Sequence, residues 1–209
     1  MQKALPTLDH VFGPVFDPQR PAWTLGGGTA LALRIGHRLG DDIDLFVPSC
    51  PLKRFTPARN PHSRAISPLF QWPGHYLRFG CEEGEIDFLS PPLQTDPGFS
   101  CEPYRGRVVA LETCAEVIVK KVRYRSAKFT VRDVFDLAAV ARCDPGVVNV
   151  LADEVSDALP RLRAVIAALR QIQPAIGAQI RPMDAYKDLA STAYDEAAAA
   201  VDAALRAGS

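Results

Sequence analysis

Residues 24–47 read TLGGGTALALRIGHRLGDDIDLFV. Three glycines at positions 26–28 precede Thr29 and a run of alanine and leucine residues, which are good helix formers. The pattern predicts a tight turn that leads into a helix over residues 29–34. Because backbone N–H groups at a helix N-terminus attract anions, and glycines let a ligand come close to the backbone, Gly27, Gly28 and Thr29 are candidates for binding phosphate.

The same stretch ends in an acidic strand. Asp42 and Asp44 alternate with apolar residues up to Val47, so both carboxylates are expected on one face of the predicted strand. Carboxylate oxygens are the ligands that a hard divalent cation prefers. A phosphate-binding turn beside paired carboxylates predicts a metal-dependent enzyme that acts on a nucleoside triphosphate.

A second pair of strands supplies a third carboxylate. Residues 75–79 and 85–89 are strand-like and flank a glycine-containing turn, which predicts an antiparallel hairpin. Asp87 lies in the second strand, on the face that it shares with Glu85 and Leu89. We predict that Asp87 completes the metal site and accepts the proton of an attacking hydroxyl.

Two predicted helices follow a short strand at residues 108–110. Thr113 and Glu116 fit a capping box at the start of the first helix, whose basic stripe includes Lys121. We expect Lys121 to neutralise triphosphate charge. The second helix, over residues 131–142, carries Asp133 and Asp136 about one turn apart, and the Ala-, Leu- and Arg-rich remainder predicts two or three more helices without recognisable chemistry.

Composition excludes several classes of protein. The chain has 209 residues, 24 basic and 24 acidic side chains and 47% hydrophobic residues, so it can form a core and has no overall charge that would recruit nucleic acid. Its five cysteines lack zinc-site spacing and predict reduced thiols. The sequence has no predicted membrane segment or signal peptide, so a soluble cytoplasmic protein that does not bind membranes is expected.

The motifs resemble those of the AbiEii/AbiGii toxin family of nucleotidyltransferases. The resemblance begins at residues 26–46, recurs at residues 85–89, and continues at Lys121 and residues 132–137. It implies an α+β fold of the polymerase-β-like nucleotidyltransferase superfamily, with a mixed sheet, helices on one face and a helical C-terminal region. We expect a nucleotidyltransferase core at residues 1–110 and a helical region at residues 111–209 that completes the active site.

The resemblance also implies a function and a set of site residues. Members transfer an NMP unit from an NTP to a hydroxyl acceptor, with Mg²⁺ or Mn²⁺, and some add nucleotides to transfer RNA. The resemblance also implies a toxin of a toxin–antitoxin or phage-defence system, with a cognate antitoxin as a partner. By the resemblance, the metal ligands are Asp42, Asp44 and Asp87, the phosphate is held by Gly27, Gly28, Thr29 and Lys121, and the later essential acid is Asp133.

Alternatives remain open at this point. A small-molecule nucleotidyltransferase of the antibiotic-modifying kind would use the same carboxylates, and a catalytically silent member would bind only nucleotide or a partner. A basic cluster favours RNA as the acceptor over protein; it comprises Lys120, Lys121, Arg123, Arg125 and Lys128. Lys120 and Arg123 are expected on a solvated helix face, and the sequence does not decide whether His37, Arg38 and Asp136 are structural or functional.

Overall fold

The computed structural model describes residues 1–208, and the chain forms two compact units. We call the first the sheet unit; it comprises residues 1–30, 40–93 and 99–112. We call the second the helical unit; it comprises residues 31–39, 94–98 and the chain from residue 113 onward. The predicted division into residues 1–110 and 111–209 stays a prediction.

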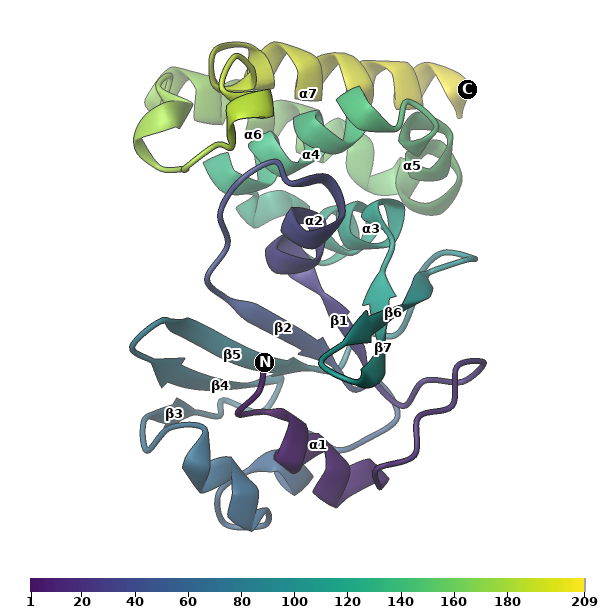
Figure 1. Ribbon diagram of the computed structural model, residues 1–209. Coiled ribbons are helices and arrows are strands. Elements are labelled where there is room, and N and C mark those ends of the chain that lie inside the picture. The colour runs from purple at the N-terminus through teal and green to yellow at the C-terminus, as the bar shows by residue number, and fades with distance from the viewer. Residues whose placement is uncertain (209) are drawn as a thin grey trace. The chain divides into compact units, whose positions relative to one another are not determined.

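The sheet unit contains a mixed seven-stranded sheet in the order β3-β4-β5-β2-β1-β7-β6 (Figure 1). β2 is parallel to β5 and β1 is parallel to β7, whereas the other neighbouring pairs are antiparallel. This arrangement confirms the predicted α+β class. The strands are β1 (Thr24–Gly26), β2 (Ile43–Phe46), β3 (Phe70–Gln71), β4 (Tyr76–Cys81), β5 (Gly84–Leu89), β6 (Phe99–Tyr104) and β7 (Arg107–Glu112).

A row of buried apolar side chains crosses five strands and forms one face of the sheet. Strand register pairs Leu77 with Phe88, Leu45 with Phe88, and Leu25 with both Leu45 and Leu111. All five are buried, and burying each such side chain contributes about 1.5–3 kcal/mol. Since side chains alternate along a strand, the neighbouring positions, which include Asp44 and Asp87, face the other way.

Short helices complete the sheet unit. Helix α1 covers Leu5–Phe12, and two 3₁₀ turns, Leu52–Phe55 and Pro61–Ala65, occupy the proline-rich stretch after β2. The ring of Phe55 stacks on Phe88 at a centroid distance of 4.9 Å, which seals the apolar face. Helix α2 (Gly27–Ile35) starts in this unit and continues along the chain into residues assigned to the helical unit.

The helical unit is built around its last helix, α7 (Leu189–Ala207), which packs against α4, α5 and α6. Buried alanines at four-residue and three-residue spacing, from Ala193 to Ala204, let these helices approach closely. The other helices are α3 (Cys114–Arg125), α4 (Val131–Cys143), α5 (Val147–Val155) and α6 (Leu159–Ile172), and 3₁₀ turns lie at Ser126–Lys128, Ser156–Ala158, Ile176–Ala178 and Asp184–Tyr186.

Two predictions about α3 need correction. Thr113 caps the helix by accepting the N–H of Glu116, but the Glu116 carboxylate accepts the backbone N–H groups of Gln94 and Thr95 instead of completing a capping box. Lys120, expected on a solvated face, is 5% exposed and lies 3.1 Å from Glu116. Burial of Glu116 explains both differences, because a buried carboxylate needs donors and a counter-charge.

The five cysteines are free thiols, as predicted. Among the residues that the structure describes, no helix combines the length and the apolar composition needed to span a bilayer.

Candidate functional site

A second row of side chains crosses the sheet on the face opposite the apolar row. Strand register pairs Arg78 of β4 with Asp87 of β5, Asp87 with Asp44 of β2, and Asp44 with Gly26 of β1. Paired residues on neighbouring strands point to the same face. We call Arg78, Asp87, Asp44 and Gly26 the polar row; it brings two of the three predicted carboxylates onto adjacent strands.

Gly27 follows the polar row directly and starts helix α2. Its φ of +66° lies in the left-handed region, and a Cβ atom there would stand 1.8 Å from Oδ2 of Asp44. Only glycine satisfies both the conformation and the space. The structure therefore places the Asp44 carboxylate against the glycine turn, beside the N-terminus of a helix whose N–H groups favour anions.

Asp42 lies just before β2 and is held from two directions. Its Oδ1 accepts the backbone N–H of Glu85 at 3.1 Å, and its carbonyl oxygen accepts the hydroxyl of Thr29. The β4–β5 turn comes close as well, since a Cβ at Gly84 would stand 2.3 Å from the carbonyl oxygen of Asp41. The Thr29 hydroxyl, predicted to donate to phosphate, thus donates to the chain that positions Asp42.

Asp87 is held by a guanidinium group. Nε and Nη2 of Arg78 donate to its two carboxylate oxygens at 2.8 and 2.7 Å, and Nη1 of Arg78 lies 2.7 Å from Glu85. The Asp87 side chain is 11% exposed and that of Arg78 is 37% exposed. The hydrogen bond to Asp87 raises the pKa of Arg78 above its usual range, so the guanidinium stays charged.

The carboxylates suit a divalent cation in kind and in backbone position. Asp44 and Asp87 are register partners, Asp42 is two residues away, and oxygen donors are what Mg²⁺ and Mn²⁺ prefer. Within residues 1–208, however, no three acidic, histidine or cysteine side chains gather closely enough to hold a metal ion. In the structure Arg78 holds the Asp87 carboxylate, and the assignment of Asp42, Asp44 and Asp87 as metal ligands stays a prediction.

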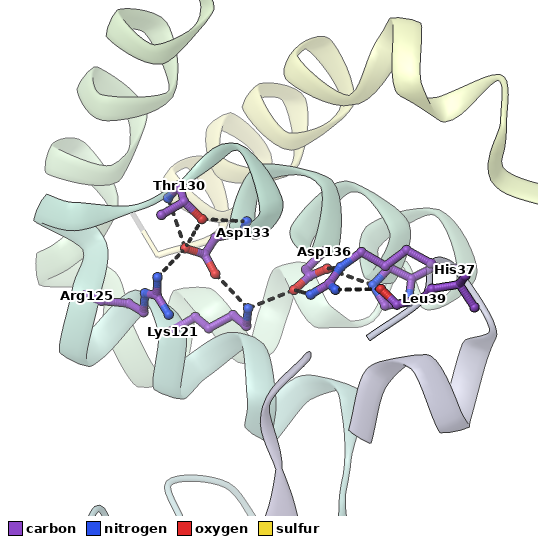
Figure 2. Close-up of polar contacts among 8 residues, drawn as sticks. His37, Leu39, Lys121, Arg125, Thr130, Asp133 and Asp136 are labelled. Atoms are coloured by element: carbon purple, nitrogen blue, oxygen red, sulfur yellow. Dashed lines mark hydrogen bonds and ion pairs between the residues drawn. The ribbon is translucent and has the colours of Figure 1, made fainter. Parts of the chain in front are cut away.

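Lys121, Asp133 and Asp136 belong to the helical unit, where they form a buried cluster (Figure 2), whereas Gly28 lies in the sheet unit, in the first turn of α2. The ammonium of Lys121 donates to Oδ1 of Asp133 at 2.6 Å and to Oδ2 of Asp136 at 2.7 Å. Burial alone would lower the pKa of Lys121, but Asp136 and Asp133 outweigh that effect and raise the pKa. Lys121 is thus a charged group between two carboxylates.

Asp133 also caps helix α4. Its Oδ2 accepts the N–H and the hydroxyl of Thr130 at 2.9 and 2.8 Å, and Thr130 accepts the N–H of Asp133 in return. Arg125 lies 3.0 Å from the same oxygen. Burial would raise the pKa of Asp133, but Lys121 and Arg125 lower it overall. This reciprocal capping box explains an acid at this helix position without reference to chemistry.

Asp136 is the centre of the cluster and is fully buried. Its Oδ1 lies 2.7 Å from Nε2 of His37 and 2.6 Å from Nε of Arg38, while Nη2 of Arg38 donates to Oδ2 at 3.0 Å. Burial raises the pKa of Asp136, but Lys121, His37 and Arg38 together hold it well below its usual value. His37 and Arg38 are 0% and 7% exposed, so neither is a surface residue.

Sequence reasoning missed Arg78 as a site residue. The hairpin prediction contained the signal, because an antiparallel turn between Cys81 and Gly84 pairs residue 78 with residue 87. No comparable signal links His37 and Arg38 to Asp136, since about 100 residues separate them and the partnership arises only from folding.

Comparisons with known proteins agree with the predicted resemblance. Residues 13–79 match the model of a family described as nucleotidyl transferase AbiEii toxin, Type IV TA system. A crystal structure of a proposed nucleotidyltransferase from H. pylori is 14% identical, with a TM-score of 0.54 over 100% of this chain and 92% of that chain. JHP933 from Helicobacter pylori is also 14% identical, with a TM-score of 0.48 over 100% and 90%. No curated protein matches the chain.

Proposed function

We infer that this chain, a nucleotidyltransferase whose residues 13–79 match the AbiEii toxin family, transfers an NMP unit from an NTP to a hydroxyl of RNA or protein. The observation that carries the proposal is the contact between Gly27 and the Asp44 carboxylate, with Asp87 on the next strand. Phosphate-binding amides and cation-binding carboxylates are the two groups that phosphoryl chemistry requires side by side.

The candidate site residues of the sheet unit would bind the cation and the phosphate and accept a proton. Asp42 and Asp44 would hold Mg²⁺ or Mn²⁺, and Asp87 would join them through one of its carboxylate oxygens. The cation, when bound, would offset charge on the phosphoryl oxygens and the leaving pyrophosphate. The backbone N–H groups of Gly27 and Gly28 would bind phosphate, and Asp87 would accept the proton of the attacking hydroxyl.

Lys121 and Asp133 have more limited roles in the proposal. An ammonium group has three donors, and Asp133 and Asp136 take two from Lys121. We therefore propose that Lys121 contacts nucleotide phosphate through its third N–H donor. Asp133 and Asp136 would act as positioning residues that fix this charge.

The proposed acceptor is RNA, with transfer RNA as the first candidate. Arg123 and Arg125 have half-exposed side chains near the end of α3, and Lys128 is exposed in the turn that follows. Exposed basic residues of this kind bind phosphate backbones without reading sequence. The match of residues 13–79 to the AbiEii toxin family supports a biological role as the toxin of a toxin–antitoxin pair. In that role a cognate antitoxin would neutralise the protein.

The direct test is transfer of label from α-³²P-labelled NTPs, each supplied singly with Mg²⁺ or Mn²⁺, to total RNA and to protein. We expect wild-type protein to label RNA and Asp44→Asn to lose at least about 100-fold in rate, because a ligand of the charge-stabilising cation is removed. Asp41→Asn, the same change at an exposed neighbouring acid, should retain activity. Equal inactivity of wild type and Asp44→Asn with all four NTPs and both acceptor classes would refute the proposal.

A further inference from the structure

Arg78 is the one member of the polar row that carries positive charge. It makes two hydrogen bonds to the Asp87 carboxylate, at 2.8 and 2.7 Å, and its remaining terminal nitrogen lies 2.7 Å from Glu85. Its guanidinium also stands 5.5 Å from the ring centre of Tyr76, on the same strand. Three neighbours therefore fix the plane of the guanidinium, and the guanidinium in turn fixes the plane of the carboxylate.

The two side chains of this pair differ in exposure, which distinguishes the pair from a surface ion pair. The Asp87 side chain is 11% exposed and belongs to the row that contains Asp44, whereas Arg78 is 37% exposed and reaches over it from the adjacent strand. Exposed ion pairs contribute little to stability. A buried carboxylate on the strand next to a second carboxylate requires a positive charge nearby, because the two negative charges otherwise repel each other.

We propose that Arg78 positions Asp87 and sets how strongly the carboxylates of the site attract a divalent cation. This inference rests on the proposed function, since it takes Asp42, Asp44 and Asp87 as the cation ligands. Three carboxylates with Arg78 carry a net charge of −2, and without Arg78 they carry −3. A carboxylate has about four lone-pair positions, so Asp87 can give one oxygen to a cation while Arg78 retains the other.

The proposal predicts opposite changes in cation affinity and turnover. Arg78→Gln removes a positive charge next to the site, so the dissociation constant for Mn²⁺ should fall about three- to tenfold. The same change releases the plane of Asp87, so kcat for transfer should fall at least about tenfold while KM for the NTP changes little. Arg78→Lys retains the charge but not the paired hydrogen bonds, so its Mn²⁺ affinity should stay near wild type while its kcat falls.

Arg107→Gln is the matched control. Arg107 also makes two hydrogen bonds to an aspartate, Asp9, at 3.0 and 2.6 Å, with both side chains about one-third exposed, and it starts β7 away from the polar row. Loss of that pair should leave both Mn²⁺ affinity and kcat unchanged.

The test measures Mn²⁺ binding to the full chain by electron paramagnetic resonance of free Mn²⁺, together with transfer kinetics. It compares wild type with Arg78→Gln, Arg78→Lys, Arg107→Gln and Asp44→Asn. Tighter Mn²⁺ binding and lower kcat in Arg78→Gln, absent from Arg107→Gln, would support the proposal. If wild type binds Mn²⁺ in a way that Asp44→Asn abolishes but Arg78→Gln leaves unchanged, the role of Arg78 is refuted and the cation site stands. If wild type binds no Mn²⁺, the cation site and this inference both fail.

Discussion

At the residue scale, Gly27 is the most restrained position of the candidate site, because two independent restraints act on it. Its backbone adopts φ +66°, and the space where a Cβ would lie is taken by the carboxylate of Asp44, 1.8 Å away. Neither restraint is required to begin a helix. The contact instead fixes the distance between the glycine turn and the carboxylate, which is the distance that a phosphate and its cation would have to bridge.

Substitution of Gly27 separates these two restraints. Gly27→Ala should lower the free energy of unfolding by about 2–4 kcal/mol, from the strained φ plus displacement of Asp44, and should abolish transfer. Gly36→Ala meets a φ of +59° with no atom within 4 Å of the new Cβ, so it should cost only about 1 kcal/mol. Urea denaturation of both variants measures the difference. Equal losses in the free energy of unfolding would show that the contact with Asp44 does not contribute to stability.

The site residues could be predicted from the sequence where they lie close together in the chain. The glycine turn, Asp42 and Asp44 lie within one short stretch, and strand parity placed both acids on the face opposite Leu45. Which donors surround a carboxylate was not predictable. Asp87 and Asp136 are each satisfied by side chains whose proximity depends on folding, and no local pattern encodes it.

At the scale of elements, the buried cluster joins α3, α4 and the segment after α2. Lys121 comes from α3, Asp133 and Asp136 come from α4, and His37 and Arg38 come from residues 31–39. Removing one member of a buried charged cluster leaves another charge without compensation, which costs about 3–5 kcal/mol. We therefore expect the cluster to contribute to both the stability and the pH dependence of the helical unit.

Asp136→Asn should reveal that pH dependence. The folded-state pKa of Asp136 lies well below the ordinary value of 3.8, so its contribution is complete above about pH 5 and is lost as pH falls toward the folded-state pKa. We expect the variant to lose about 3–5 kcal/mol at pH 7 and to show a shallower loss of stability between pH 5 and pH 3 than wild type. Urea denaturation at several pH values measures both effects.

Asp202→Asn provides the control for this prediction. Asp202 pairs with Arg163 at 2.8 Å in the same unit, but both side chains are 39% exposed. Its loss should cost no more than about 1 kcal/mol at pH 7. If the free energy of unfolding fell equally steeply with pH for wild type and Asp136→Asn between pH 5 and pH 3, Asp136 would not be the acid-sensitive charge.

Hydrophobic periodicity and capping residues predicted the β4–β5 hairpin and helices α3 and α4, but not β6. That strand contains Pro103, which usually argues against a strand. β6 is an edge strand, paired only with β7 in the sheet order, and a proline is tolerated where one side of a strand has no partner. The position of a strand within its sheet cannot be read from the strand's own sequence.

At the scale of the whole molecule, the two units are interleaved along the chain. The helical unit includes residues 31–39 and 94–98 in addition to the chain from residue 113 onward. Both short segments provide donors to buried acids, since His37 and Arg38 contact Asp136 and the N–H groups of residues 94 and 95 reach Glu116. A boundary at 110/111, as predicted from the sequence, would separate these donors from their acceptors.

A fragment of residues 111–209 tests that boundary. We expect it to be helical by circular dichroism but to lack the cooperative unfolding transition of the full chain, because Glu116 and Asp136 would lose the donors that residues 37, 38, 94 and 95 supply. Urea titrations of fragment and full chain under the same conditions give the comparison. A fragment that unfolds as cooperatively as the full chain would show that residues 111–209 form an independent domain.

In the function proposed above, Asp42, Asp44 and Asp87 share one cation beside the glycine turn. Anomalous X-ray scattering from crystals of the full chain with Mn²⁺ and a non-hydrolysable NTP tests it most directly. We expect a manganese peak within about 2.5 Å of oxygens from all three carboxylates, with the triphosphate at the N-terminus of α2. A peak elsewhere, or a nucleotide bound away from Gly27 and Gly28, would contradict it.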